Sequence, residues 1–450
     1  MQCGWIVLVG IAACGEAKRP PTFGPRDAAP EVDTGPPDTG PDGSAIDAGD
    51  PPLPEPDIEL VLPFGAPAQE VDLEYEAAVR LLDLHLCVDT TSSMFEEIDE
   101  IQAELQTTVA AGVDAAVDDV TFGVSEFEDF PFDPFGGPDD RPFTLLQDQT
   151  RSLADALSAV RRLDDPLGFG GDFPESTAEA LYQIATGEGF VTGGDVLVES
   201  HEPTEEARGG VSFRPGALPV VVVATDERSH APADYASSFE GAHSLAEATD
   251  ALEALGARVV GIASGEAARS TLVPAAIATA AAVPPTDGVC ATGIDGAEVP
   301  PEGDVCPLVF DVNGDGSGLS EAIVDAIGRL LESIVWRTVA IRIEDDGLGF
   351  VVRAEALSSE AVAGTPEPGL ADLDPVDGVD ETFTDVYRGT RLVYRITAQN
   401  LRIEPSDYDQ IFYLRGLLVG DGDTIVDDKL IRIRIPAGAA GWFDAGPDAG

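Results

Sequence analysis

Apolar and polar positions follow two different periodicities in the middle of the chain. Short apolar runs predict strands at 81–88, 121–127, 219–225 and 258–263. The run 219–225 is almost wholly β-branched, which is typical of a strand buried on both faces of a parallel sheet. Strands that alternate with helices indicate an α/β fold with a doubly wound, mostly parallel sheet. Apolar residues at helical spacing predict the intervening helices at 96–117, 152–162, 176–186, 245–255 and 319–334.

The pattern changes after residue 336, where helical spacing gives way to strand-like alternation. This alternation is typical of an all-β sandwich domain. Two further strand-like segments, 58–62 and 71–75, precede the α/β region. The predicted strands of the second region are 338–344, 349–353, 391–397, 412–419 and 429–435.

The first residues have the features of a targeting segment. Trp5–Ala13 is apolar but too short to span a bilayer, as expected for a signal-peptide core. The ending at Cys14 resembles a bacterial lipobox, which implies lipidation of Cys14 and a lipid-anchored protein of the bacterial cell envelope. Gly15 after the cysteine implies the outer membrane or cell surface. The alternative is a plain cleaved signal peptide with a chance cysteine.

Composition excludes several classes of function. The chain has 450 residues, with 25 Lys+Arg against 83 Asp+Glu and a formal net charge of −58. Such a charge repels phosphate backbones and anionic lipids, so we expect no nucleic-acid partner and no membrane contact except through the lipid anchor. No phosphate-binding Gly-rich loop is followed by Lys, which argues against a P-loop enzyme. Four histidines are present, none in a recognisable metal-ligand spacing.

Two cysteines flank a loop rich in Gly, Pro and acidic residues. In an exported protein, Cys290 and Cys306 are expected to form one disulfide that closes this loop. Two free surface thiols are the alternative. Cys87, inside a predicted strand, is interpreted as a small buried apolar residue.

Oxygen-bearing side chains follow the predicted strands at their carboxyl ends. Asp89, Thr91 and Ser93 follow the first strand at alternate positions, so that one turn can direct a carboxylate and two hydroxyls at one point. Asp226 follows the β-branched strand, and the segment 170–175 precedes a helix. Ligand sites in open α/β sheets lie at this edge, and hard oxygens suit cations such as Mg²⁺. A helix cap with a turn is the alternative for the first motif.

The three motifs together resemble a von Willebrand factor type A (vWA) domain, and more narrowly the version in integrin β subunits. The family's metal-ion-dependent adhesion site has an Asp-x-Ser-x-Ser motif, matched by Asp89, Thr91 and Ser93 with Thr for the first Ser. Its other two ligands are matched by Glu175 and Asp226. The resemblance covers roughly residues 80–335. It implies a Rossmann-like fold and Mg²⁺ or Mn²⁺ as the bound ion.

The same resemblance implies adjacent cation sites, for which Ca²⁺ is a candidate. Glu96 and Glu97 match the acidic ligands of the second ion, although they could simply complement the helix dipole. Asp129, Asp172 and the Pro174 carbonyl match ligands of the third ion, where Gly170 replaces an Asn ligand. Asp129 could equally be solvated surface. The segment 311–317 starts like a Ca²⁺ loop but has Ala at position twelve, which favours a turn.

In integrin β chains the α/β domain is inserted into a β-sandwich, and the same layout is expected here. The segment 15–56 is rich in Pro, Asp and Gly and predicts an extended linker. The predicted organisation is a lipoprotein signal peptide at 1–14, a linker at 15–56, sandwich strands at 57–79, a vWA-like domain at 80–336, a β-sandwich at 337–437 and a tail at 438–450.

The function expected from these features is cation-dependent, adhesion-type binding of a protein ligand that offers an acidic side chain. A structural surface or assembly scaffold with a vestigial site is the alternative. A metal-assisted hydrolase is less favoured, because neither a nucleophile elbow nor a Cys/His pair is present, and no enzyme activity is expected.

Overall fold

The computed structural model describes residues 55–117, 119–204, 206–372, 381–421 and 423–438. The predictions for the signal peptide with Cys14, for nearly all of the linker and for the tail beyond residue 438 lie outside the described residues.

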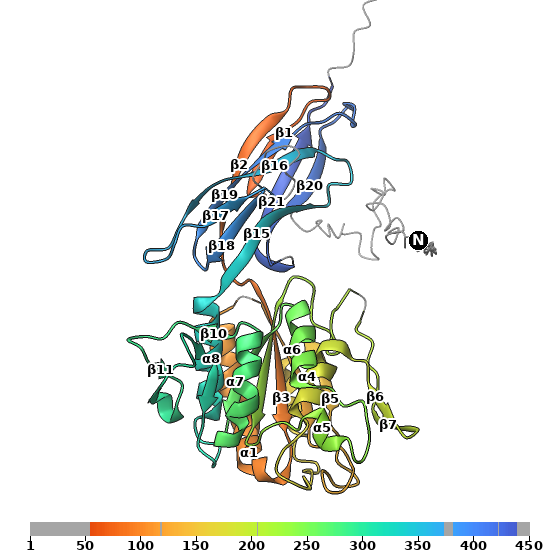
Figure 1. Ribbon diagram of the computed structural model, residues 1–450. Helices are drawn as coiled ribbons and strands as arrows, with labels where there is room; N and C mark the ends of the chain where they lie inside the picture. Colours follow the sequence, from red (N-terminus) through yellow and green to blue (C-terminus); the bar gives the residue numbers. More distant parts are fainter. Residues whose placement is uncertain (1–54, 118, 205, 373–380, 422, 439–450) are drawn as a thin grey trace, which may run out of the picture. The chain divides into compact units, whose positions relative to one another are not determined.

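A six-stranded sheet forms the centre of the α/β region (Figure 1). Its neighbouring strands are parallel except at β5, which pairs with β4 antiparallel. The predicted mixed α/β class with a parallel-containing sheet is therefore confirmed. The strands follow in the order β14 (Val309–Asp311), β9 (Arg258–Ala263), β8 (Leu218–Thr225), β3 (Leu81–Asp89), β4 (Asp119–Phe127) and β5 (Thr144–Thr150).

The two central strands explain why the sheet needs cover on both faces. All eight residues of β8 are buried, as are eight of the nine residues of β3. An uninterrupted buried run of this kind has no polar face to turn toward water, so helices must pack on both sides. The carboxyl ends of β3 and β8 are thereby held by rigid, fully packed elements.

The helices that cover the sheet fall into two groups by their contacts. One group comprises α4 (Thr177–Thr186), α6 (Leu245–Ala254) and α7 (Arg269–Ala278); Figure 1 shows these three in front of β3. Ser244 caps α6, because its hydroxyl accepts a hydrogen bond from the Glu247 N–H. The other group comprises α1 (Phe95–Glu104), the π-helical segment η2 (Leu105–Ala110), α2 (Ala111–Asp114), α3 (Leu153–Val160) and α8 (Leu319–Ser333).

Two further sheets make up an all-β region. Strand β1 (Ile58–Val61) pairs with β21, and β2 (Gln69–Glu76) pairs with β19, so the segment before the α/β region joins strands that follow it. A three-stranded sheet has the order β16 (Val351–Glu360), β19 (Arg391–Ala398), β2. A six-stranded sheet has the order β1, β21 (Thr424–Ile435), β20 (Gln410–Gly420), β15 (Val335–Glu344), β18 (Thr382–Tyr387) and β17 (Gly369–Ala371).

Buried tyrosines connect these two sheets. The hydroxyl of Tyr75 donates to the Gly416 carbonyl at 3.1 Å, and that of Tyr394 donates to the Val339 carbonyl at 2.7 Å. Each pair joins the three-stranded sheet to the six-stranded one. A buried tyrosine is stable when its hydroxyl finds such a partner, so both rings can fill the space between the sheets.

The predicted disulfide is confirmed. Cys290 and Cys306 are bonded, with their Cα atoms 5.4 Å apart. They belong to short strands, β11 (Cys290–Ala291) and β13 (Cys306–Pro307), whose partners are β12 (Glu298–Val299) and β10 (Ala282–Val283). Cys87 is buried and free, as interpreted from the sequence. Among the described residues, no helix is both long and apolar enough to cross a membrane.

Candidate metal centre

Three loops meet at the carboxyl edge of the central sheet. Asp89 is the last residue of β3, and Asp226 directly follows β8, the strand beside it. Glu175 lies just before α4, in a segment that bridges to Ser229 in the loop after β8. Because β3 and β8 are parallel neighbours, their ends bring the two aspartates to the same edge.

Asp89 is fully buried and its carboxylate is held in one orientation. The Thr91 N–H and Thr91 Oγ1 donate to Asp89 Oδ1 at 3.0 and 2.7 Å. Thr225 Oγ1, from the end of β8, donates to Asp89 Oδ2 at 2.7 Å. The Ser93 hydroxyl lies 3.2 Å from Thr91 Oγ1. The first motif therefore forms a compact set of oxygens, and it does not cap a helix, since neither Thr91 nor Met94 makes a side-chain cap bond.

The segment 168–175, called the glycine-rich loop below, brings Glu175 against the first motif. A Cβ on Gly170 would lie 3.2 Å from Glu175 Oε1 and 3.4 Å from the Thr91 methyl carbon. Gly170 also has a positive φ of 57°, a conformation that glycine adopts without strain. Asp140 stabilises this loop, because its carboxylate accepts from the N–H groups of Phe169 and Gly170, each at 3.0 Å.

Several carboxylate oxygens at this edge are buried without a hydrogen-bond partner. They are Oε2 of Glu175 and Oδ1 of Asp226, together with Oε2 of Glu97. Buried polar atoms nearly always have a partner, because leaving one unsatisfied costs on the order of 1–3 kcal/mol. Three such atoms on neighbouring acidic side chains indicate a place where a cation fits.

The raised pKa values of the carboxyl groups also indicate a place where a cation fits. Burial, together with the charge of Asp226, raises the pKa of Asp89 to about 7. Burial raises the pKa of Glu175 to about 12, and the charges of Asp89, Asp129 and Asp226 act in the same direction. Without a cation, protons bound to these carboxyl groups neutralise their negative charge. A divalent cation would take the place of these protons.

The donor set fits a hard divalent cation. Asp89, Glu175 and Asp226 offer carboxylate oxygens, and Thr91 and Ser93 offer hydroxyls; no sulfur or nitrogen ligand belongs to this set. Mg²⁺ and Mn²⁺ prefer such oxygens at about 2.1 Å and retain some bound waters. The structure brings all five predicted residues to one edge, and these five would hold the ion directly or through water.

The two candidate residues of the second site differ in their surroundings. Glu97 is buried, and Ser264 donates a hydrogen bond to its Oε1. Burial raises the pKa of Glu97, and this hydrogen bond lowers it only in part. Glu96 is exposed on the first turn of α1. Glu97 is therefore close enough to the candidate site for the charge of Asp226 to raise its pKa.

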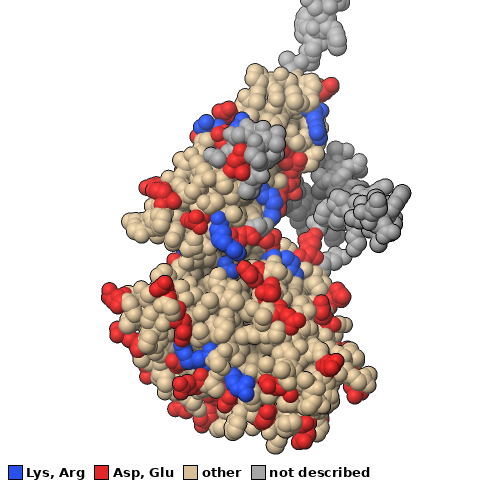
Figure 2. Space-filling view, viewed as in Figure 1, with Lys and Arg blue, Asp and Glu red and all other residues tan. Residues whose placement is uncertain are grey.

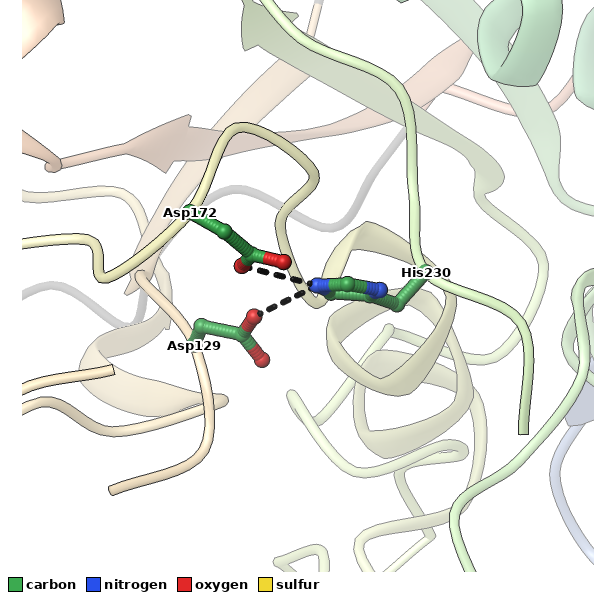
Figure 3. A group of neighbouring side chains, drawn as sticks. All are labelled: Asp129, Asp172 and His230. Carbon is green, nitrogen blue, oxygen red and sulfur yellow. Dashed lines mark hydrogen bonds and ion pairs between the residues drawn. The ribbon is translucent and has the colours of Figure 1, made fainter. Parts of the chain in front are cut away.

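The candidate residues of the third site lie together, but with an unexpected neighbour. Asp129 and Asp172 both face His230, whose Nε2 lies 3.2 Å from Asp129 Oδ2 and 3.1 Å from Asp172 Oδ1 (Figure 3). Pro174 is buried in the same loop as Asp172. The spacing of the histidines along the sequence gives no sign of this cluster, in which Asp129, Asp172 and His230 have potential ligand atoms all within 4.8 Å of one another.

Sequence reasoning missed the residues that support these ligands. Thr225 orients Asp89, Asp140 orders the glycine-rich loop, and Asp234 contacts His230. A signal for Thr225 was present, because it is the last residue of the β-branched run and lies beside Asp226. No comparable signal existed for Asp140 or Asp234, whose roles depend on contacts between loops distant in sequence.

Acidic side chains outnumber basic ones on the face of the molecule shown in Figure 2. This distribution matches the net charge of −58. The summed field of such a surface raises the local concentration of cations. The candidate site therefore lies in a molecule whose net charge attracts cations.

Comparisons with known proteins find structural neighbours but no sequence relatives. No protein-family model and no curated protein matches the chain. A von Willebrand factor type A protein from Catenulispora acidiphila is similar in structure. It has 16% identity and a TM-score of 0.34, and the match covers 83% of this chain and 71% of that one.

Two other solved structures have comparable scores. Proximal thread matrix protein 1 from the mussel byssus has 15% identity and a TM-score of 0.32, covering 57% of this chain and 48% of that one. The pilus adhesin SpaC from Lactobacillus rhamnosus GG, in its open conformation, has 11% identity and a TM-score of 0.31, covering 84% and 46%. Because these TM-scores are low, we draw no conclusion about function from the similarities.

Proposed function

We propose that the protein binds a protein ligand through a divalent cation, Mg²⁺ or Mn²⁺, held by Asp89, Thr91, Ser93, Glu175 and Asp226. The observation that carries the proposal is the set of buried, unpartnered oxygens of Glu175 and Asp226 beside the fully buried Asp89. These groups are costly to bury together unless a cation neutralises them.

The cation would act as a bridge between the two proteins. With ligands on one side only, one coordination position stays open for an acidic side chain of the partner. Both charges are partly dehydrated in such a contact, which makes the bond stronger than an ion pair in water. No chemical step is required of the site, so its activity is binding and not turnover.

The direct test of this proposal is capture of partners by the immobilised chain, with Mg²⁺ and with a chelator. Partners should be retained with Mg²⁺ and released by the chelator, and Asp226→Asn should capture none of them. Glu96→Gln is the matched control, because it removes an exposed carboxylate nearby and should capture normally. Partners that are retained in the presence of the chelator and are also captured by Asp226→Asn would favour the scaffold alternative.

We further propose that the protein is anchored in the bacterial envelope by lipidation at Cys14. The support is the sequence alone: an apolar run ends at this cysteine, and a segment rich in Pro, Asp and Gly follows it. Cys14→Ser should move the protein from the membrane fraction to the soluble fraction. Membrane retention of this variant would contradict the anchor.

A further inference from the structure

Two phenylalanine side chains of the glycine-rich loop are exposed to solvent. Phe173 is 79% exposed and Phe169 is 74% exposed, the two highest values among the large apolar side chains of the described residues. Phe95, the first residue of α1, is half-exposed as well. Single exposed apolar residues are common on protein surfaces, but two in one short loop concentrate apolar surface in one place.

This apolar surface borders the candidate site. Phe173 lies two residues before Glu175, and Phe169 directly precedes Gly170. The backbone of Gly170 lies against the predicted ligands, because a Cβ there would be 3.2 Å from Glu175 Oε1 and 3.4 Å from the methyl carbon of Thr91. A partner that reached a cation at this site would therefore also meet the glycine-rich loop.

The backbone of the loop is held in place while its two phenyl rings stay exposed. The Gly168 N–H donates to the Thr90 carbonyl at 2.8 Å, and the Phe169 N–H donates to Asp140 Oδ1 at 3.0 Å. At the other end of the loop, the Glu175 N–H donates to a carbonyl of the loop after β8. A loop that is ordered before binding loses little conformational entropy when a partner contacts its side chains.

The two kinds of group at this edge require two kinds of group on the partner. A phenyl ring has no hydrogen-bonding atom, so it contributes to binding chiefly when it is buried against apolar side chains. The proposed cation at Asp89 and Asp226 takes a carboxylate. A surface that satisfies both has an acidic side chain with large apolar side chains next to it.

We propose that Phe169 and Phe173 select a protein partner whose metal-bound acidic side chain is flanked by large apolar residues. This inference rests on the proposed function, because the cation supplies the contact with the acidic side chain. A lipid surface is the other partner that exposed phenyl rings and a bound cation could contact. The net charge of −58 repels anionic lipids, so the observations favour a protein.

The test uses two libraries of cyclic peptides on beads and the full chain in Mg²⁺. One library has a fixed central Asp, the other a fixed central Asn, and the neighbouring positions are random in both. The chain should bind beads of the Asp library, and chelator should release it. Among the bound Asp peptides, Leu, Ile, Val, Phe, Tyr and Trp should be enriched beside the Asp.

The most strongly bound peptide is then titrated against variants of the loop. Phe169→Ala and Phe173→Ala should each weaken its binding by about 10-fold, and the double variant by about 100-fold. Both side chains are largely exposed, so their removal should leave the fold and the calorimetric binding of Mg²⁺ unchanged. Phe64→Ala is the matched control, because Phe64 is an exposed phenylalanine between β1 and β2 in the all-β region.

The outcomes separate this inference from the proposed function. Asp-specific, Mg²⁺-dependent binding without apolar enrichment, or equal affinity of wild type and the double variant, would overturn this inference alone. Equal binding of both libraries with and without chelator would overturn the proposed function and this inference together. Sedimentation of wild type, but not of the double variant, with phosphatidylserine vesicles in Mg²⁺ would overturn the inference in favour of a lipid surface.

Discussion

Millimolar Mg²⁺ is expected to stabilise the wild-type chain against heat, and Asp226→Asn is expected to abolish that effect while stabilising the metal-free protein. An ion that binds only the folded state adds about 2.7 kcal/mol to the free energy of unfolding when its concentration is 100 times Kd. Asp226→Asn removes a ligand for the ion. It also removes one of several carboxylates that repel one another at an effective cost on the order of 1 kcal/mol or more.

Asp226→Asn should lower the melting temperature relative to wild type in Mg²⁺ and raise it without Mg²⁺. This change of sign distinguishes a metal ligand from a residue that only supports the fold. Asp89→Ala should also abolish the Mg²⁺ effect. Glu96→Gln is the control, since Glu96 is exposed and outside the donor set. The measurement is a melting curve of each variant with Mg²⁺ and with a chelator. Equal Mg²⁺ stabilisation of wild type and Asp226→Asn would contradict the assignment.

The stability of the metal-free protein is expected to fall as pH rises from about 4 to about 7. In the unfolded chain an aspartate has a pKa of about 3.9, whereas burial raises the pKa of Asp89 to about 7 in the folded chain. Between these values the folded state holds a proton that the unfolded state has lost. The free energy of unfolding therefore decreases by up to about 1.4 kcal/mol per pH unit for this group.

Glu175 extends the decrease in the free energy of unfolding to higher pH, because burial and nearby carboxylates raise its pKa to about 12. Mg²⁺ replaces these protons, so its stabilising effect should be small near pH 5 and large near pH 8. Burial also raises the pKa of Glu126 to about 7 and of Glu128 to about 8, which adds to the same trend. The difference between curves with and without Mg²⁺ therefore isolates the metal centre. A Mg²⁺ effect that is equal at all pH values would contradict this account.

The sequence predicted the central strands and their ends well, because burial leaves a strong local signal there. The β-branched run became β8, and Asp89 and Asp226 lie where strand ends were expected. The edge strand β5 and the short strands β14 and β18 were not predicted. All seven residues of β5 are half-buried, so it lacks alternation, and β14 has only three residues.

The sequence predicted those residues of the candidate site that belong to recognisable motifs. The burial of Glu97 could have been predicted, because Glu97 lies four residues before the buried Ile101 and so shares its face of α1. The carboxylate neighbours of His230 could not have been predicted from the sequence. They are far away in the chain, and only the packing of three loops brings them to one nitrogen.

Calorimetric titration of the intact chain with Mg²⁺ and with Mn²⁺ tests the central claim most directly. The site at Asp89, Thr91, Ser93, Glu175 and Asp226 predicts one saturable binding event at up to millimolar concentration, lost in Asp89→Ala and Asp226→Asn and retained in Glu96→Gln. Absence of binding by the wild-type chain at millimolar Mg²⁺ and Mn²⁺ would contradict the adhesion-site account and leave the scaffold as the leading function.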